Sequence, residues 1–257
     1  MPEGDAIHGT AKQVGTALVG REIVSIETPQ ARHAVDRWPE RLEGRPVRGV
    51  DARGKHLFVR FEGDLTLHSH LRMTGMWGVY RRGQRWRRSP RRAWLVLRTH
   101  EHDVVQFDGP VLELMTDSRT RFDQRLAALG PDVLVETFDH QRFLARLREG
   151  DQSRGIGDAL LNQRSLAGVG NVWKSEGCFL AGIDPWRPLR DVSDEEALAT
   201  VGEIRPLMQA SVEGRRGPRR WVYGRGGQPC RRCGGQIRAR GQGDENRTTY
   251  WCPRCQA

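Results

Sequence analysis

Apolar side chains near the start of the chain recur at steps of four, three and four residues, at Ile7, Ala11, Val14 and Leu18. This repeat is typical of a helix with one apolar face, and it predicts a helix over residues 5–18. Gly20 follows the last apolar position and ends the helix. The chain is therefore expected to open with an amphipathic helix.

Between residues 21 and 116 the pattern changes to short apolar runs separated by turn residues. These runs predict strands at Glu22–Glu27, Pro46–Asp51, His56–Phe61, Asp64–Leu71, Ala93–Arg98, Val104–Phe107 and Val111–Met115. Short strands at close spacing favour a β-sandwich or a barrel. The segment Arg81–Arg92 contains seven arginines and Trp86, and we expect it to be a mobile basic loop.

From residue 137 to 213 the periodicity becomes helical. It predicts helices at Phe138–Arg148, Gly157–Asn162, Asn171–Leu180 and Asp194–Glu213. Ser193, followed three residues later by Glu196, predicts a capping box for the last of these helices. The Arg- and Gly-rich stretch Gly214–Gln228 is expected to be a linker.

The charge of the chain indicates its class of partner. The 257 residues carry a net charge of +10, which favours a polyanionic partner such as nucleic acid. No apolar run approaches the roughly 18 residues that a membrane span needs, and the N-terminus lacks the basic and apolar regions of a signal peptide. We therefore expect a cytoplasmic protein that is neither secreted nor bound to a membrane.

Four of the five cysteines lie in the last 28 residues. Cys230 and Cys233 form one CxxC pair, Cys252 and Cys255 form another, and 18 residues separate the pairs. This spacing predicts a four-thiolate zinc ribbon that holds one structural zinc ion. Two disulfides or a redox pair are the alternatives, and the lack of an export signal disfavours them. Cys178 lies in an apolar helical stretch and is expected to be buried.

The N-terminus offers a possible nucleophile. Removal of Met1 would expose Pro2 as a secondary amine, and a terminal amine titrates near about pH 8. The helix dipole beside that amine disfavours its protonated form. Glu3 could act as a general acid if burial kept its carboxyl group protonated. Taken alone, Met-Pro-Glu is an ordinary start to a protein.

Three further segments change this interpretation: Arg53–Leu57, Leu166–Asn171 and Asn246–Gln256. In this order and spacing, together with the N-terminus, they resemble the formamidopyrimidine-DNA glycosylase and endonuclease VIII family of base-excision repair enzymes. The resemblance spans essentially the whole chain, and it is specific because four unrelated motifs must coincide.

The resemblance implies a covalent mechanism. In that family the N-terminal proline attacks C1′ of a damaged nucleotide, expels the base, forms a Schiff base and then cuts the strand by elimination. Pro2 matches this nucleophile, and Glu3 matches the acid that protonates the sugar. Lys55 matches a lysine near the lesion phosphate, although a surface lysine in a turn is the alternative. Arg247 matches an arginine that grips the phosphates flanking the lesion, unless it is one more exposed arginine.

Other residues are expected to contact DNA. Met73 matches a side chain that wedges into the gap left by a flipped base, and core filling is its alternative. Asn171 follows the glycines of the helix–two-turn–helix motif, where the family contacts phosphate, and it could also be an N-cap. His70 and Arg72 share one face of the strand Asp64–Leu71 with Thr66 and His68, and this face suits phosphate contact or is solvated without a task.

The fold that follows is an α+β multidomain protein. We expect an N-terminal catalytic β-sandwich domain with an N-terminal helix over residues 1–130, a helix–two-turn–helix DNA-binding domain over residues 131–217 and a zinc-ribbon hairpin over residues 218–257. The expected partner is damaged double-stranded DNA, bound by a monomer.

Two short segments indicate the branch of the family. The opening Pro2–Asp5 resembles the endonuclease VIII branch, and the stretch Phe107–Glu113 lacks the Arg-Arg-Phe-Gly segment of the purine-lesion branch. Both features favour oxidised pyrimidines as substrates, whereas Arg72 departs from the glutamine of the endonuclease VIII pattern. The alternatives are a purine-lesion glycosylase of the same fold and a zinc-ribbon DNA-binding protein without catalysis, which would not need Pro2, Glu3 and Lys55.

Overall fold

The computed structural model describes residues 2–30, 33, 36–215 and 220–256. They form two compact units. The first contains Pro2 and Ala6–Ala127, and the second contains Glu3–Asp5 together with the described residues from Ala128 onward. The expected domain boundary between residues 217 and 218 lies outside the described residues.

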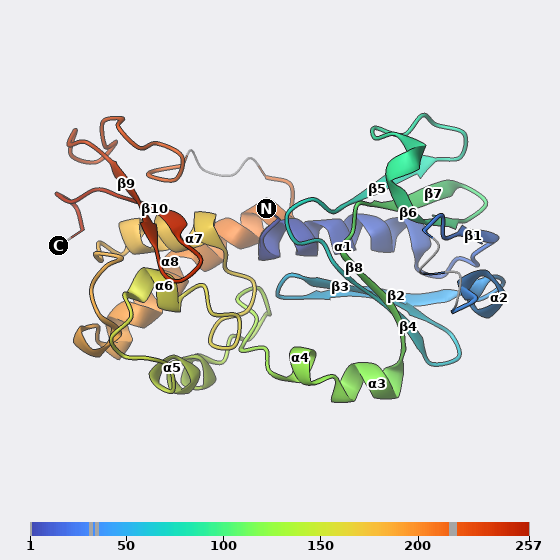
Figure 1. The fold of residues 1–257 in the computed structure, drawn as a ribbon, viewed down its shortest axis with the longest axis horizontal. Helices are drawn as coiled ribbons and strands as arrows, with labels where there is room; N and C mark the ends of the chain where they lie inside the picture. Colours follow the sequence, from blue (N-terminus) through green and yellow to red (C-terminus); the bar gives the residue numbers. More distant parts are fainter. Residues whose placement is uncertain (1, 31–32, 34–35, 216–219, 257) are drawn as a thin grey trace. The chain divides into compact units, whose positions relative to one another are not determined.

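The first unit contains two four-stranded antiparallel sheets and most of helix α1 (Gly4–Leu18) (Figure 1). One sheet has the order β2-β3-β4-β8, formed by Val47–Arg53, His56–Phe61, Leu65–His70 and Val111–Thr116. The other has the order β1-β6-β7-β5, formed by Ser25–Glu27, Ala93–Arg98, His102–Phe107 and Met76–Arg81. The β-sandwich with an N-terminal helix is therefore confirmed.

One apolar core joins the helix to both sheets, because side chains such as Val14, Leu67 and Leu97 belong to the same buried cluster. Ser69 is a polar residue within this core. Its hydroxyl accepts hydrogen bonds from Trp77 Nε1 at 3.2 Å and Gln106 Nε2 at 3.3 Å, so it is satisfied by the opposite sheet.

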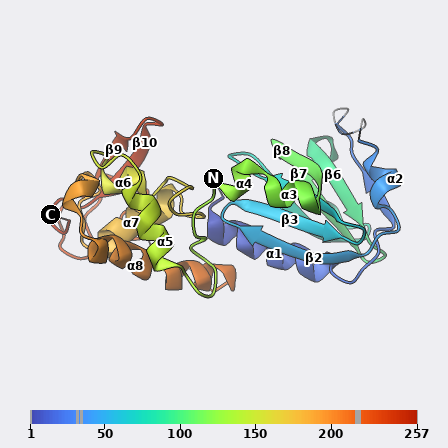
Figure 2. The same cartoon turned by 90° about the horizontal axis from the view of Figure 1, so that it is seen from below.

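Short helices cover the other side of the β2-β3-β4-β8 sheet. α3 (Asp117–Phe122) and α4 (Gln124–Ala127) lie across this sheet from α1 (Figures 1 and 2). These helices, α2 (Trp38–Leu42) and strand β5 are absent from the sequence-based expectation. Strand β5 escapes a period-two search because Gly78 interrupts it and because Trp77 and Tyr80 are buried in different clusters.

The segment Arg81–Arg92 is mostly a loop, as we expected, and it makes specific contacts with the sheet. Arg81 ends β5, and Pro90–Arg92 forms the short 3₁₀ helix η2. Trp86 packs against Tyr80 and Phe107, with ring centroids 6.3 Å and 5.9 Å away. The aromatic contacts hold the segment against the sheet, which charge counting alone could not reveal.

The second unit is helical and carries a β-hairpin. Its main helices are α5 (His140–Arg148), α6 (Ile156–Ala159), α7 (Asn171–Leu180) and α8 (Asp194–Val212), with the short 3₁₀ helix η3 at Leu189–Asp191. The hairpin consists of β9 (Arg238–Gln242) and β10 (Arg247–Trp251), and α7 packs against both α8 and β10. The capping box of Ser193 and Glu196 is confirmed. Among the described residues, no helix is long and apolar enough to span a membrane.

Candidate active site and metal centre

The four predicted cysteine ligands converge. Their sulfur atoms all lie within 4.8 Å of one another, and Cys230, Cys233, Cys252 and Cys255 are all free thiols. A tetrahedral zinc with bonds of about 2.3 Å needs sulfur atoms roughly 3.8 Å apart. The Sγ–Sγ distances of 3.9 Å between Cys230 and Cys255 and 3.5 Å between Cys233 and Cys252 fit this geometry. The donor set is therefore that of one structural zinc ion, and the disulfide alternative is wrong.

Backbone amides support the thiolates. The Arg232 and Gly235 amides each donate to a ligand sulfur at 3.4 Å. The bond from Gly235, followed by the neighbouring thiols, lowers the pKa of Cys233 to about 7. Burial raises the pKa of Cys252, and burial followed by the neighbouring thiols raises the pKa of Cys255 to about 12. Because metal ligands must be deprotonated, metal binding at this cluster releases protons.

Glu3 caps helix α7. Its carboxylate accepts hydrogen bonds from the backbone amides of Gly170 at 3.1 Å, Val172 at 2.7 Å and Trp173 at 3.3 Å. The side chain is only 5% exposed. Donors of this kind stabilise a carboxylate and satisfy amides that the first turn of a helix leaves unpaired. The structure thus fixes Glu3, the residue next to the expected nucleophile Pro2.

The glycines of the Gly168–Gly170 turn make this contact possible. A Cβ atom at Gly170 would lie 2.4 Å from Cδ of Glu3, and one at Gly4 would lie 2.9 Å from the Cα atom of Gly168. Gly168 also has a φ of +100°, and its carbonyl accepts from the Gly4 amide at 2.8 Å. The turn therefore needs glycine to accommodate the N-terminal segment, a long-range reason that the sequence did not reveal.

Asn171 is not the N-cap, because Gly170 takes that position and Asn171 is the first residue of α7. Its Nδ2 atom donates to the carbonyl of Thr248 in the hairpin at 2.8 Å. Its Oδ1 atom is buried and has no hydrogen-bond partner among the described residues. Asn171 therefore connects α7 to the hairpin, and its expected contact with phosphate stays a prediction.

Arg247 begins strand β10, opposite Gln242, at the end of the hairpin turn. Its guanidinium pairs with the Glu245 carboxylate at 2.5 Å. The Glu245 carboxylate thus occupies one edge of the Arg247 guanidinium, the group that the resemblance assigns to phosphate binding. This placement near the tip of the hairpin agrees with the sequence-based expectation.

Lys174 is a buried residue whose surroundings the sequence analysis missed. It is fully buried in α7, and its Nζ atom donates to Thr249 Oγ1 of the hairpin at 2.5 Å. Burial lowers its pKa to about 8, against the attraction of Cys178, Asp158 and Glu3. The rarity of lysine could have drawn attention to Lys174, because the chain contains only three lysines among 42 lysine and arginine residues.

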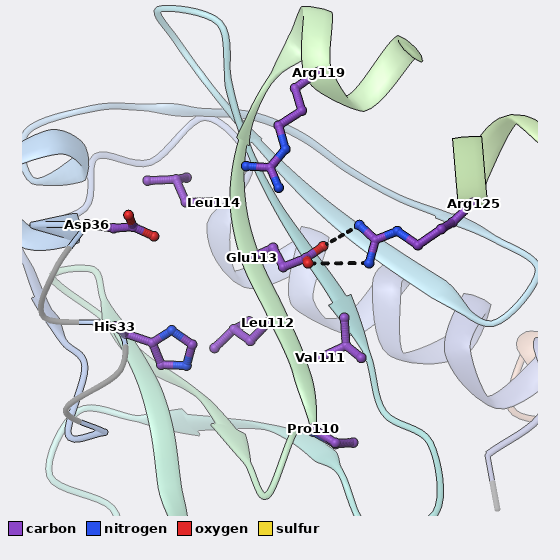
Figure 3. Close-up of a pocket in the computed structure, with 9 residues that line it drawn as sticks. All are labelled: His33, Asp36, Pro110, Val111, Leu112, Glu113, Leu114, Arg119 and Arg125. Atoms are coloured by element: carbon purple, nitrogen blue, oxygen red, sulfur yellow. Dashed lines mark hydrogen bonds and ion pairs between the residues drawn. The ribbon is translucent and has the colours of Figure 1, made fainter. Parts of the chain in front are cut away.

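In the first unit, the outer face of β4 is buried rather than solvated. His68 is 1% exposed, and its ring stacks on Phe58. His68 Nε2 lies 2.8 Å from His56 Nδ1, and His68 Nδ1 lies 3.2 Å from Glu113 Oε2. Arg125 holds Glu113 with two hydrogen bonds (Figure 3). The helices that cover this face explain why the alternative of a solvated face without a task is wrong, whereas the expected phosphate contact stays a prediction.

Charge and burial keep these imidazoles neutral. Burial, then the charges of His70 and His68, lowers the pKa of His56 to about 2. Burial, then the charges of His68, Lys55 and Arg72, lowers the pKa of His70 to about 4. The predicted residues Lys55, His70 and Arg72 therefore lie close enough to share one electrostatic environment.

Three of the predicted DNA contacts occupy turns. Lys55 follows Gly54, which has a φ of +59°, in the turn between β2 and β3. Arg72 has a φ of +45° in the loop after β4, and the next residue, Met73, is 65% exposed. Met73 therefore does not fill the core, and that alternative is wrong.

Family models match nearly the whole chain. The formamidopyrimidine-DNA glycosylase N-terminal domain matches residues 1–124, the H2TH domain of the same enzymes matches residues 129–220, and a zinc finger found in FPG and IleRS matches residues 227–257.

Curated relatives agree with these matches. The chain is 43% identical to a probable endonuclease 8 2 of Streptomyces coelicolor, over 100% of this chain and 94% of that protein. It is 37% identical to the DNA-(apurinic or apyrimidinic site) lyase Nei2 of Mycolicibacterium smegmatis, over 100% of this chain and 99% of that protein.

Solved structures show the same fold. The Lactococcus lactis formamidopyrimidine-DNA glycosylase bound to DNA with an abasic site has a TM-score of 0.84 and 26% identity, with 99% of each chain covered. The fold, the cysteine cluster and the sequence matches together define a family of DNA repair enzymes. The chain belongs to the formamidopyrimidine-DNA glycosylase and endonuclease VIII family, and several of its similar relatives are named endonuclease 8.

Proposed function

We propose that this protein is a bifunctional DNA glycosylase and abasic-site lyase that removes oxidised pyrimidines from double-stranded DNA. The observation that carries this proposal is the fixed carboxylate of Glu3, one peptide bond from Pro2, on the three amides that begin α7. If Glu3 only capped α7, it would not need an N-terminal secondary amine as its neighbour. Family membership supports the same reaction.

Pro2 supplies the nucleophile. Its neutral nitrogen attacks C1′ of the damaged nucleotide, the bond from C1′ to the base breaks, and the ring-opened sugar remains on Pro2 as an iminium. Loss of a proton from C2′ then expels the 3′ phosphate and cuts the strand. Glu3 lies beside this centre and is proposed to deliver the proton that opens the sugar ring. The carboxylate must gain that proton, because its amide partners favour the ionised form.

Cationic and neutral polar side chains are proposed to hold the DNA. Lys55 and Arg72 supply positive charge near the neutral imidazole of His70 in the first unit, and Asn171 and Arg247 begin adjacent elements of the second unit. Phosphate would replace Glu245 as a partner of Arg247, since a guanidinium fork suits either anion. Zinc, when bound by the four cysteines, ties the hairpin together and takes no part in the chemistry.

Oxidised pyrimidines are the expected substrates because the opening Pro2–Asp5 resembles the endonuclease VIII branch and because Phe107–Glu113 lacks the Arg-Arg-Phe-Gly segment of the purine-lesion branch. The Lactococcus lactis formamidopyrimidine-DNA glycosylase was solved both with DNA that contains an oxidised pyrimidine and with Fapy-dG DNA, so its structures do not decide between the two substrate classes. After Phe107 the chain passes through the short connection Asp108–Pro110 into strand β8, and this stretch carries no pair of arginines that could fill the space opposite a purine lesion.

The test is a lesion panel. Duplexes with thymine glycol, 5-hydroxycytosine, 8-oxoguanine or a preformed abasic site are incubated with the protein, and strand cleavage is followed under single-turnover conditions. We expect the two pyrimidine lesions to be cut at least ten times faster than 8-oxoguanine. Faster cleavage of 8-oxoguanine would assign the purine-lesion alternative, and binding without any cleavage would assign the non-catalytic one.

A further inference from the structure

The segment Arg81–Arg92, here called the arginine arm, contains seven arginines and no acidic residue. The family-derived function does not use it. A charged segment of this kind is often a solvated surface, so its anchoring decides whether it has a task.

The arm is anchored at one end by Asp103. The Asp103 carboxylate accepts from Arg82 at 2.9 Å and from Trp86 Nε1 at 3.4 Å. The Arg87 amide donates to the Tyr80 hydroxyl at 3.3 Å. These bonds and the packing of Trp86 fix the backbone of the arm against strands β5 and β7.

At its other end the arm is tied to the loop that presents Met73. Arg88 donates to the carbonyl of Thr74 at 3.0 Å and to the carboxylate of Asp108 at 2.7 Å. Arg92 binds the same carboxylate at 2.7 Å, and the Thr74 hydroxyl donates to the Asp108 carbonyl at 3.2 Å. Asp108 thus joins the arm and the Met73 loop into one piece of structure.

Some of the positive charge in the arm is not compensated. Two aspartates pair with Arg82, Arg88 and Arg92. In contrast, Arg85, Arg87 and Arg91 are exposed and make no ion pair within the described part of the chain. Arg85, Arg87 and Arg88 also line a hollow of about 850 Å³. Cations around a concave surface are suited to a polyanion, and the anchored backbone that carries them reduces the entropy lost on binding.

We infer that the arginine arm is a second DNA-contacting surface, which binds backbone phosphates of the duplex whose damaged site receives Met73. This inference rests on the proposed function, because DNA lies beside the arm only if Met73 inserts into a damaged duplex. The contact is to phosphate and carries no sequence information, since guanidinium groups on a backbone position the duplex without reading bases.

The test compares two variants with equal loss of charge. Arg87→Ala/Arg91→Ala removes uncompensated cations from the arm. Arg119→Ala/Arg121→Ala removes two arginines from α3, which lies on the far side of the β2-β3-β4-β8 sheet from the arm (Figure 1). Affinity for a duplex with a tetrahydrofuran abasic analogue is measured by fluorescence anisotropy from 50 to 200 mM KCl, and zinc content and thermal unfolding confirm that each variant is folded.

Loss of two phosphate contacts should reduce the slope of log K against log salt by about 1.8. Between 50 and 200 mM KCl the arm variant should therefore lose about 12-fold less affinity than the wild type, whereas the α3 variant should follow the wild type. Equal slopes in all three proteins would overturn the inference, and so would equal reductions in both variants, because these indicate bulk charge. If the salt dependence of binding differs between the proteins as expected but the wild type forms no borohydride-trapped adduct, the proposed function is wrong. The inference that the arginine arm contacts DNA phosphates is then retained.

Discussion

At the scale of single residues, Glu3 has two tasks that make opposite demands. Both of its oxygens accept from backbone amides at the start of α7, which favours a charged carboxylate. The proposed reaction requires the same group to donate a proton. The entering substrate must therefore shift this balance, as desolvation of a carboxylate by bound DNA would do.

Glu3→Gln separates these tasks. The amide nitrogen of glutamine cannot accept from a backbone amide, so one or two capping bonds are lost, and a loss of about 1–2 kcal/mol in stability is expected. Excision of a damaged base should fall by about 10²-fold or more, because proton donation is removed. Cleavage at a preformed abasic site should fall much less.

Single-turnover rates on thymine-glycol and abasic duplexes measure this difference, with thermal unfolding as the control for the cap. Equal losses on both substrates would show that Glu3 acts only through structure or serves every step.

The buried histidines of the first unit predict a dependence of stability on pH. His56 and His70 have pKa values of about 2 and about 4 in the folded chain, against about 6.5 when unfolded. The unfolded chain therefore binds more protons below pH 6.5. The free energy of unfolding should fall as the pH is lowered from 6.5 toward 4, by up to about 1.4 kcal/mol per pH unit for each histidine.

The measurement is urea denaturation between pH 7 and pH 5. His56→Gln keeps a hydrogen-bonding side chain beside His68 but removes one titrating group, so its stability should vary less steeply with pH. A wild-type stability that does not change over this range would contradict the assigned environment of His56.

The sequence allowed some site residues to be found and not others. The zinc ligands were predictable because each CxxC pair is local and has a fixed spacing. The capping role of Glu3 was not, because its amide partners lie about 167 residues away in the chain. The N-cap alternative for Asn171 was wrong for the same reason: a local rule favours asparagine as a cap, whereas Gly170 takes the N-cap position and the distant Glu3 carboxylate satisfies the amides of the first turn.

At the scale of elements, the hairpin β9–β10 concentrates the contacts of the second unit. Asn171 and Lys174 of α7 both bond to it, at Thr248 and Thr249. Gln256 continues the connection: its Oε1 accepts from the Cys252 amide at 2.8 Å, and its Nε2 donates to the carbonyl of Ile183 at 2.9 Å. The position of Arg247 therefore depends on the metal centre and on α7 together.

Arg247→Ala should leave zinc content and thermal stability unchanged, because the residue begins the strand and its ion-pair partner Glu245 is exposed. Cleavage of damaged duplex should fall by about 10²-fold, whereas Arg231→Ala and Arg254→Ala should change it by less than about threefold. Cleavage rates and metal analysis of the three variants make the comparison. Similar small losses in all three would reduce Arg247 to a contributor of bulk charge.

Removal of one zinc ligand tests the hairpin itself. Four thiolates on one zinc contribute on the order of 10 kcal/mol to local folding. Cys252→Ser should therefore lose both the metal and the activity, and treatment with a chelator should reproduce the loss in the wild-type protein. Full activity without bound metal would show that the hairpin folds without zinc.

Elements with regular periodicity were predicted well from the sequence. The strands His56–Phe61 and Ala93–Arg98 and the helix Asn171–Leu180 match their expected bounds. Helix α5 begins two residues later than expected, because Asp139 caps it by accepting from the Arg142 amide. The helices α3 and α4 have six and four residues, too few for a helical repeat to be visible. Their absence from the prediction left open the wrong alternative that the histidine face is solvated.

At the scale of the whole molecule, the net charge of +10 and the family fold point to the same class of partner. The charge alone indicates only a polyanion. The identity of the reaction depends on an amine at the N-terminus, on a carboxylate fixed next to it and on family membership, and none of these follows from composition. The central claim is therefore chemical: Pro2 becomes covalently bonded to DNA.

Borohydride trapping tests that claim most directly. The protein is incubated with a duplex that contains an abasic site, the iminium is reduced, and the adduct is digested and located by mass spectrometry. We predict a single adduct on the N-terminal peptide at Pro2, and its loss when the N-terminus is extended by one residue. An adduct on Lys55 or Lys174, or undiminished trapping by the extended protein, would contradict the account.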